Sequence, residues 1–494
     1  MMKKAAVIGA GIGGIAGALR LAHKGYHVNV FEANDYPGGK LSAFTLGKYR
    51  FDSGPSLFTM PHLVNDLFEL FNEKPSKYFS YKKKKIACQY FWDDHTELTA
   101  YSNNSLYFDE VENKLGIKSN SLKKYLDRAK RKYELTAPLF LERSLHKFQG
   151  FVNIETVKAL LNLSLFEINQ NLHSVNASQL REPHLVQMYD RYATYNGSSP
   201  FQTPGIMTLV QHLEQEFGTY IPIRGMEQIT LCLFELAKRK GVLFNMSEKV
   251  KKIIVEKGKA VGIKTEKVEN RFDLILSNVD IFPTYKNLLR DQKAPKRILR
   301  QERSSSAVIF YWGIKNQFDQ LDLHNIFFSK NYKSEFDSIF NQNNVSDDFT
   351  VYVNITSKDI PQDAPEGCEN WFVMVNVPSD HGQDWESIKT RLREKTIKKL
   401  NKILKVNLET MIEEEVVMTP PLIAQKTASH MGALYGSSSN NKIAAFLRHP
   451  NFNSKIKNLY FCGGSVHPGG GIPLCLLSAK IATDLIPNAS NTKD

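Results

Sequence analysis

The pattern of apolar and polar positions at the start of the chain predicts a β-α-β unit. Residues 5–8 form a continuous apolar run, which is typical of a short strand buried on both faces. An apolar-rich helix is expected to follow, to about His23, with Gly25 just beyond it as a helix-ending glycine. Residues 27–31 again have the apolar pattern of a strand. Two strands joined by one helix indicate a parallel sheet.

The same segment also has the order of a secretory signal peptide, because Lys3 and Lys4 precede an uncharged run from Ala5 to Leu19. The five glycines in this run argue against that interpretation. Its 15 residues are fewer than the roughly 20 that a membrane-spanning helix needs. The sequence therefore predicts a soluble or peripheral protein.

The pattern G-x-G-x-x-G between the first strand and the helix predicts a dinucleotide site. In such a unit Gly9 permits the tight turn, Gly11 lets the backbone approach a pyrophosphate, and Gly14 lets helix and strand pack closely. Gly13 lies in the same loop. Glu32 ends the second strand, where an acid accepts hydrogen bonds from a ribose and disfavours NADP. An isolated pattern is as often an ordinary glycine turn, but strands, helix and acid in register favour a cofactor.

A second glycine-rich segment extends this motif. In flavoproteins of the glutathione-reductase and amine-oxidase type, a Glu is followed six and seven residues later by Gly-Gly, which carries the FAD phosphates. Residues 32–40 are similar in this spacing, and a glycine turn after a short hairpin follows over residues 51–55. A Pro-Gly turn between surface strands is the alternative for residues 34–40. The residues predicted to bind FAD here are Gly38, Gly39, Lys40, Gly54 and Pro55.

The last glycine-rich segment closes the predicted site. Residues 458–462 are a predicted strand, and a helix predicted from Leu474 to Ile486 has Pro473 in its first turn. The three successive glycines at 469–471, just before the helix, offer a backbone surface without side chains for a flat isoalloxazine ring, and the helix N-terminus favours negative charge on reduced flavin. A flexible linker is the alternative. The predicted contacts are Gly463, Gly464, Gly470, Gly471 and Ile472.

The middle of the chain is predicted to supply the remaining strands of a Rossmann sheet. A helix from Gly225 to Gly241 precedes predicted strands around Val250 and over residues 260–265 and 272–276. A backbone amide near Val250 is expected to meet the adenine.

The predicted fold class is α/β, with a Rossmann-type FAD-binding domain (glutathione-reductase/amine-oxidase-like) and an inserted α+β substrate domain. The FAD-binding domain is discontinuous and consists of residues 1–70, 219–296 and 415–494. Residues 71–218 and 297–414 form the substrate domain, which is expected to face a membrane.

Composition and charge limit the kinds of partner that the protein is expected to bind. Of 494 residues 23% are charged and 42% hydrophobic, a globular balance that excludes a disordered chain. The net charge of +13 is compatible with nucleic acid, an anionic membrane or acidic ligands, but no nucleic-acid-binding motif accompanies it. The five cysteines form no CxxC pair and the 13 histidines no HExxH motif, so no metal is predicted. A reducing cytoplasm is the expected compartment.

Five further strings are more specific: residues 51–55 (FDSGP), 191–195 (RYATY), 324–329 (HNIFFS), 364–370 (APEGCEN) and 467–473 (HPGGGIP). With the glycine motifs, they resemble the bacterial carotenoid desaturases of the phytoene-desaturase type over almost the whole chain. Within that family the chain is most similar to the 1-hydroxycarotenoid 3,4-desaturases. The resemblance implies FAD, a long polyene substrate and removal of two hydrogens. Isomerases, ketolases and aldehyde-forming enzymes share these motifs, and GDP-dissociation inhibitors share the fold but bind prenyl groups without flavin.

Hydride abstraction from an allylic carbon leaves a delocalised cation, so such an enzyme must mainly hold one C–H bond against flavin N5 and exclude water. Arg191, Tyr192 and Tyr195 are candidates for the substrate side and for binding a terminal hydroxyl, with a purely structural role as the alternative. His467 is a candidate for shaping the flavin pocket or moving a proton, and the alternative is a histidine held by a backbone carbonyl. No residue is singled out to accept the second hydrogen.

The expected substrate class offers an explanation for the net positive charge of the chain. A carotenoid comparable in length to the bilayer core, roughly 30 Å, does not cross water, so we expect a cytoplasmic enzyme peripherally associated with an anionic membrane. Candidate surfaces are Lys82–Lys85, among aromatic residues between 78 and 92, and the segment 139–166. A solvated surface is the alternative for the lysine run.

Overall fold

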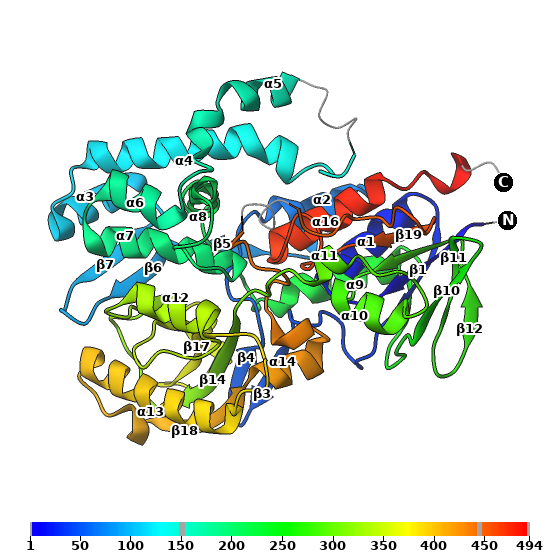
Figure 1. The fold of residues 1–494 in the computed structure, drawn as a ribbon. Coiled ribbons are helices and arrows are strands. Elements are labelled where there is room, and N and C mark those ends of the chain that lie inside the picture. Colours follow the sequence, from blue (N-terminus) through cyan, green and yellow to red (C-terminus); the bar gives the residue numbers. More distant parts are fainter. Residues whose placement is uncertain (1, 148–153, 442–446, 492–494) are drawn as a thin grey trace.

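Two large sheets organise the chain, which a computed structural model describes over residues 2–147, 154–441 and 447–491. Figure 1 shows both termini beside the first sheet, the second sheet at the opposite end of the molecule, and a layer of helices above the second sheet.

The first sheet has five parallel strands in the order β19-β13-β1-β2-β9. The predicted β-α-β unit is confirmed, with α1 spanning Ile12–His23 between its two strands. The remaining strands come from the middle and the end of the chain, so the sheet joins three separated segments. The strands are β1 (Lys4–Ile8), β2 (His27–Phe31), β9 (Leu243–Asn245), β13 (Leu274–Ser277) and β19 (Leu459–Phe461).

The two faces of this sheet are covered differently, because successive side chains of a strand point to opposite faces. Ala5 and Val7 of β1 pack against a layer of helices, whereas Ala6 and Ile8 pack against a small antiparallel sheet. The helices of this layer are α1, α2 (His62–Glu69), α9 (Glu227–Arg239) and α16 (Ile472–Asp484).

The small sheet corrects one prediction. Two strands predicted for the Rossmann sheet, around Val250 and over residues 260–265, belong instead to an antiparallel three-stranded sheet. The physical reason is the short turn at Lys257 and Gly258, because a two-residue connection joins antiparallel neighbours and parallel strands need a crossover. Its strands are β10 (Lys252–Glu256), β11 (Lys259–Lys264) and β12 (Glu269–Arg271).

The second sheet has seven strands in the order β18-β14-β17-β16-β15-β6-β7, antiparallel except for the pair β15 and β6. Helix α13 (Trp385–Leu404) covers one face of it with a shared apolar core. The strands are β6 (Ile86–Phe91), β7 (Glu97–Tyr101), β14 (Ser306–Ile314), β15 (His324–Phe327), β16 (Val351–Ile355), β17 (Glu369–Val377) and β18 (Ile412–Met418).

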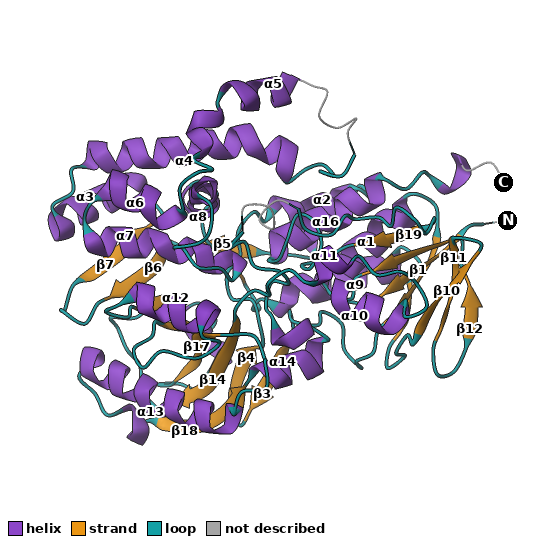
Figure 2. Cartoon of the chain, viewed as in Figure 1, coloured by secondary structure: helices purple, strands orange, loops and turns teal. Residues whose placement is uncertain are grey.

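Helices between residues 104 and 215 lie on the other face of this sheet, beside β6 and β7 (Figure 2). Helix α12 (Tyr332–Asn341) joins their apolar core. These helices are α3 (Asn104–Leu115), α4 (Ser119–Phe140), α5 (Ile154–Leu161), α6 (Leu172–Leu180), α7 (Pro183–Asp190) and α8 (Gln211–Gln215). The short elements elsewhere are β3 (Ala43–Leu46), β4 (Tyr49–Asp52), β5 (Tyr81–Lys83), β8 (Tyr220–Pro222), α10 (Ile281–Pro283), α11 (Lys296–Leu299) and α14 (Pro420–Thr427).

One predicted domain boundary falls inside a strand. The boundary between residues 414 and 415 divides β18, whose Val416 and Val417 pair with β14 in the second sheet. The strand pairing therefore places residues 415–418 in the second sheet, together with residues 412–414. The rest of the proposed division into two discontinuous domains stays a prediction.

Of the lysine run at Lys82–Lys85, three side chains are exposed and one is buried, so a basic surface at this segment stays a prediction. Lys84 is buried and pairs with Asp322 at 2.7 Å and with Asp359 at 2.5 Å. The aromatic side chains of Tyr90, Phe91 and Trp92 are buried in apolar cores. The reason is that this segment leads into a central strand, a fact that charge alone does not reveal. In the described part of the chain, no helix is both long and apolar enough to cross a membrane.

Candidate flavin site and substrate cavity

A cavity of about 1200 Å³ lies between the two sheets and reaches the helical layer. This volume exceeds the roughly 300–1,000 Å³ of an ordinary small-molecule site, so it has room for a cofactor and a second ligand. Of the residues predicted to bind FAD, all except Gly14 line this one cavity. Gly14 lies behind it, where a Cβ atom would be 2.0 Å from the carbonyl oxygen of Gly9.

The loop between β1 and α1 forms a backbone cradle at one end of the cavity. Gly9 has φ of +96°, a left-handed conformation that favours glycine. A Cβ atom at Gly11 would be 2.7 Å from Oδ1 of Asn278, and one at Gly13 would be 3.3 Å from Cα of Gly463. The N-terminus of α1 starts in this loop, and its free N–H groups attract phosphate.

Glu32 is the acid at this end of the cavity. Its side chain is buried, and each carboxylate oxygen accepts one backbone N–H, from Ala10 at 2.7 Å and from Asn34 at 2.9 Å. A carboxylate oxygen accepts more than one hydrogen bond, so both oxygens retain capacity for the hydroxyls of a ribose. Val250 lines the cavity just before β10 begins.

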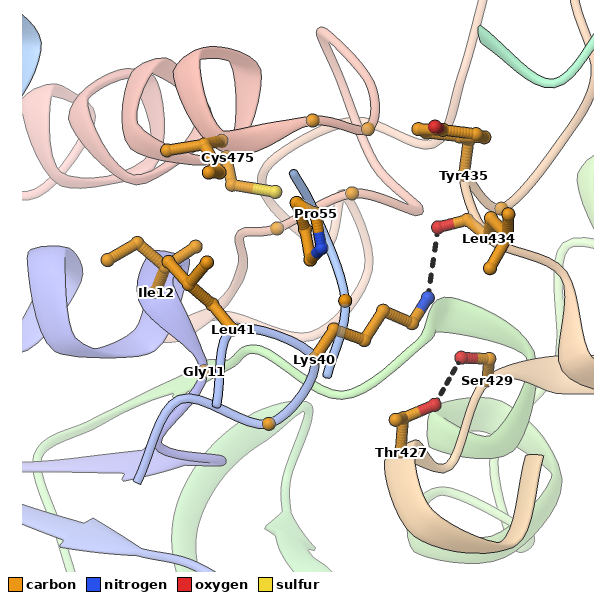
Figure 3. A pocket seen from close by; sticks show the side chains of 18 of the residues that line it. Gly11, Ile12, Lys40, Leu41, Pro55, Thr427, Ser429, Leu434, Tyr435 and Cys475 are labelled. Atoms are coloured by element: carbon orange, nitrogen blue, oxygen red, sulfur yellow. Dashed lines mark hydrogen bonds between the residues drawn. The ribbon is translucent and has the colours of Figure 1, made fainter. Parts of the chain in front are cut away.

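The second glycine segment lies against the first. The N–H of Gly38 donates to the carbonyl of Ala10 at 2.8 Å, and Gly39 has φ of +58° and a Cβ position 4.0 Å from Cα of Gly11. Lys40 extends away from Gly11 and donates to the Leu434 carbonyl at 2.9 Å (Figure 3). Burial lowers the pKa of Lys40. The ammonium group of Lys40 therefore lies away from the glycine loop that is predicted to bind the phosphates, on the side of the C-terminal glycines.

The C-terminal glycines form a wall of bare backbone. A Cβ atom at Gly470 would be 2.9 Å from Cα of Tyr435, and one at Gly464 would be 3.2 Å from Cα of Gly470. Gly471 has φ of +102° and no atom within 4 Å of a Cβ position, and α16 begins at the next residue, Ile472. The free helix N-terminus thus faces the cavity. Gly54 and Pro55 line the cavity nearby (Figure 3).

His467 adjoins this wall, and its geometry favours the structural alternative. The side chain is buried, and Nε2 lies 2.8 Å from the carbonyl oxygen of Arg143, which makes Nε2 the donor. Burial lowers the pKa of His467 to about 4, so the ring is neutral at physiological pH and a weak base. A proton-transfer role for His467 stays a prediction. The hydrogen bond to Arg143 does not support that role, because it uses Nε2 as a donor to the backbone.

Arg191 and Tyr195 lie together at the helical end of the cavity, around a carboxylate. Arg191 is buried and donates to Oε1 of Glu214 at 2.9 Å and to the Tyr195 hydroxyl at 2.8 Å. The Tyr195 hydroxyl donates to Oε2 of Glu214, and the Tyr192 hydroxyl donates to Oε1 at 3.2 Å. Burial raises the pKa of Tyr195, so its hydroxyl stays protonated and can donate.

Much of the remaining cavity wall is apolar. It is formed by the inner face of the second sheet and by residues of the helical layer. These residues include Phe140, Leu141, Met207, Leu209, Ile309, Ile326, Phe372 and Met374.

The comparison with protein families decides the class. Residues 12–487 match the model of the flavin containing amine oxidoreductase family. The chain belongs to this family. Its cofactor is FAD, and the fold class expected from the sequence is confirmed.

Individual relatives agree with this membership. The flavoprotein is 54% identical over 489 residues to the 1-hydroxycarotenoid 3,4-desaturase of Flavobacterium sp. (strain P99-3), an alignment that covers 99% of this chain and 100% of that protein. It is 30% identical over 501 residues to the 4,4'-diaponeurosporene oxygenase of Staphylococcus aureus (strain MSSA476), with 100% of each chain covered. Among solved structures, it is similar to cyclohexylamine oxidase from Brevibacterium oxydans IH-35A, with a TM-score of 0.63, 14% identity and 100% of both chains covered.

The residues of this flavoprotein fit an FAD. The glycine loops leave space that side chains would fill, and a helix N-terminus and a buried acid stand where a pyrophosphate and a ribose need them. Gly9, Gly11 and Glu32 would hold the nucleotide, and Gly471 with the N-terminus of α16 would lie against the ring.

Sequence reasoning missed two groups in this cavity. Asn278 follows β13 directly and donates to the Cys462 carbonyl at 3.2 Å, which links the first and last glycine loops. Its position at the carboxyl end of a parallel strand was the available signal. Tyr352 on β16 lies 2.7 Å from both Oγ of Ser56 and Nδ1 of His324, and burial lowers the pKa of His324 to about 4. Their separation in the sequence left no local signal for this group.

Glu214 was also missed, although the sequence carries a signal for it. It lies four residues after Val210 and three before Phe217, which is the spacing of an apolar stripe on a helix. A carboxylate at such a position is buried and needs a partner, which Arg191 supplies.

Proposed function

We propose that this flavoprotein is a carotenoid desaturase that introduces the 3,4 double bond into a 1-hydroxycarotenoid. The observation that supports this most strongly is the 54% identity, over 99% of the chain, to an enzyme of that name. The long apolar stretch of cavity wall, continuous with the flavin site, suits a polyene. FAD supplies the acceptor for a hydride from carbon. The chain holds the polyene along the apolar wall and excludes water from the reacting bond.

The direct test uses the purified holoenzyme and an acyclic 1-hydroxy polyene without oxygen. We expect the flavin absorption band to bleach, the polyene absorption maximum to shift to the red, and the product to be lighter by two hydrogen atoms. The matched control is the same polyene already carrying the 3,4 double bond, which should leave the flavin oxidised. A product of unchanged mass would make the protein an isomerase instead.

A second candidate is a terminal oxygenase, because a relative at 30% identity is named an oxygenase. The same assay separates the two in the presence of oxygen, since an oxygenase adds oxygen mass to a polyene that lacks the hydroxyl. A binding protein of the GDP-dissociation-inhibitor type would carry no flavin band, and the family membership argues against it.

We also propose that the protein works in the cytoplasm, attached peripherally to an anionic membrane. Support comes from α5 and the turn after it, where Val157, Leu160, Leu161 and Leu163 are all at least half exposed. Figure 1 shows α5 as the outermost helix of the helical layer. The inner side of α5 shares a small apolar core with Ile206, which lines the cavity, so this surface adjoins the route to the site. Residues 148–153 of the predicted segment lie outside the described residues.

Introducing two negative charges on α5 tests this attachment. The double variant Leu160→Glu/Leu161→Glu should reduce the fraction of protein that sediments with anionic phospholipid vesicles at least about tenfold, because burying each leucine contributes about 1.5–3 kcal/mol. The control is Leu231→Glu/Val268→Glu, which changes two exposed apolar residues of the flavin-binding lobe and should sediment like the unchanged protein. Equal sedimentation of all three proteins would argue against α5 as the docking surface.

A further inference from the structure

The carboxylate of Glu214 retains hydrogen-bonding capacity toward the cavity. Its Oε1 accepts two hydrogen bonds, from Arg191 and Tyr192, whereas its Oε2 accepts one, from Tyr195, among the described residues. A carboxylate oxygen has two acceptor positions, so Oε2 has one to spare. Glu214 and Tyr195 line the cavity, and Tyr192 does not. We therefore infer that the free acceptor position of Oε2 faces the cavity, where a ligand would bind.

Arg191 offers a matching donor. Its Nε donates to the Tyr90 hydroxyl at 2.9 Å, and its Nη2 donates to Glu214 at 2.9 Å. Nη1 carries two hydrogens and donates to one acceptor in the described chain, the Tyr195 hydroxyl at 2.8 Å. One donor and one acceptor thus remain on either side of the Tyr195 oxygen. That pair complements an alcohol, which both donates and accepts one hydrogen bond.

This cluster lies close to the wall predicted to face the flavin. A Cβ atom at Gly197, two residues after Tyr195, would be 2.8 Å from Cδ2 of Tyr435. The backbone of Tyr435 in turn packs on Gly470 of the C-terminal glycine wall. Tyr435 therefore connects the main chain beside the cluster with the flavin-facing backbone. The carbon C1 of a polyene is two bonds from C3, so the group that binds a hydroxyl on C1 must lie near the reacting bond.

We propose that Glu214 and Arg191 bind the terminal hydroxyl of the polyene, which donates to Oε2 of Glu214 and accepts from Nη1 of Arg191. This inference rests on the proposed function for the identity of the ligand. The ion pair carries no net charge, so it binds a neutral alcohol without placing an uncompensated cation beside a polyene that becomes cationic when hydride is abstracted. A polyene without the hydroxyl leaves a buried donor and acceptor unpaired, and such sites discriminate strongly against the deoxy analogue. Glu214 and Arg191 are thus specificity-determining residues.

The test is a ratio of dissociation constants, measured from the change in polyene absorption with protein whose bound FAD has first been reduced without oxygen, so that it accepts no hydride. The two ligands are an acyclic polyene with a hydroxyl on C1 and the same polyene without it. We expect the hydroxylated polyene to bind about 10- to 100-fold more tightly, since hydrogen bonds to charged groups are being compared. Glu214→Gln, which keeps the shape and removes the charge, should bring the ratio below about threefold. An unchanged ratio in this variant would overturn the proposal.

The control variant is Tyr107→Phe, which removes another buried hydroxyl, one that lies 3.0 Å from the Tyr189 hydroxyl and outside the cavity lining. Its ratio should equal that of the unchanged protein. A third ligand serves if Glu214→Gln fails to fold. The C1 methyl ether accepts a hydrogen bond but cannot donate one, so it should bind the unchanged protein like the deoxy polyene. A methyl ether that binds as tightly as the alcohol would contradict the role of Glu214.

The outcome is separable from that of the proposed function. Desaturation of both polyenes with no preference in binding would refute the hydroxyl site and leave the desaturase assignment standing. Preferential binding of the hydroxylated polyene without loss of two hydrogens would do the reverse.

Discussion

Gly11→Ala is expected to weaken FAD binding at least about 100-fold, which corresponds to about 2.8 kcal/mol. The added Cβ atom would lie 2.7 Å from Oδ1 of Asn278, inside contact distance, and would occupy the surface over which a pyrophosphate approaches the backbone. The loop cannot retreat, because Asn278 is itself held by the Cys462 carbonyl at the end of β19. The protein should fold and purify largely without its flavin.

The measurement is the flavin absorbance that survives gel filtration, followed by titration with FAD. Gly116→Ala is the control, because Gly116 lies outside the cavity lining and has no atom within 4 Å of its Cβ position; its φ of +68°, against −68° at Gly11, adds backbone strain alone. That change should lower the free energy of unfolding by about 1 kcal/mol and leave the flavin content unaltered. Stoichiometric flavin in purified Gly11→Ala would show that the cradle is not the pyrophosphate site.

Arg191→Leu is expected to lower the free energy of unfolding by about 3–5 kcal/mol, because it leaves the Glu214 carboxylate buried without a counter-charge. Both side chains are less than one-tenth exposed, and they form a 2.9 Å ion pair. The Tyr90 hydroxyl, which accepts from Arg191, also loses its donor. The change thus removes the hydrogen bonds that Arg191 donates to Tyr90, Tyr195 and Glu214.

Urea unfolding in saturating FAD measures this effect. The double variant Arg191→Leu/Glu214→Leu removes both charges and should be more stable than Arg191→Leu alone, since no unpaired charge remains. Arg393→Leu is the control, because Arg393 pairs with Glu415 and Glu409 near the surface, where its side chain is 29% exposed and solvent weakens the pairing. Its cost should stay at or below about 1 kcal/mol. Equal stability of the Arg191→Leu and Arg393→Leu variants would contradict this account.

The local parts of the flavin site could be predicted because glycine acts locally. At Gly9, Gly38 and Gly471 the backbone has a positive φ that other residues rarely adopt, so a glycine there marks a particular turn in the sequence itself. The predicted helix to His23 and the strand over residues 27–31 end where α1 and β2 end, because strand and helix periodicity are also local.

The two errors have different causes. The strand over residues 260–265 has an ordinary apolar pattern, and its antiparallel pairing with β10 and β12 follows from short connections, which the assignment to the central sheet left out of account. Lys84 belongs to a charge run that is normally solvated, yet Asp322 and Asp359 compensate it in a buried position. These two aspartates are more than 200 residues away from Lys84, beyond the reach of any window along the chain.

The sequence by itself determined the class of cofactor, the β-α-β unit and the glycine loops, since each depends on the conformational freedom and spacing of neighbouring residues. Only the tertiary structure decided which polar groups share the substrate cavity. Tyr90 on β6, Arg191 after α7 and Glu214 on α8 meet because the seven-stranded sheet and the helical layer pack together. Their burial, rather than their order along the chain, makes this cluster a site, because an ion pair withheld from water must satisfy every hydrogen bond within the fold.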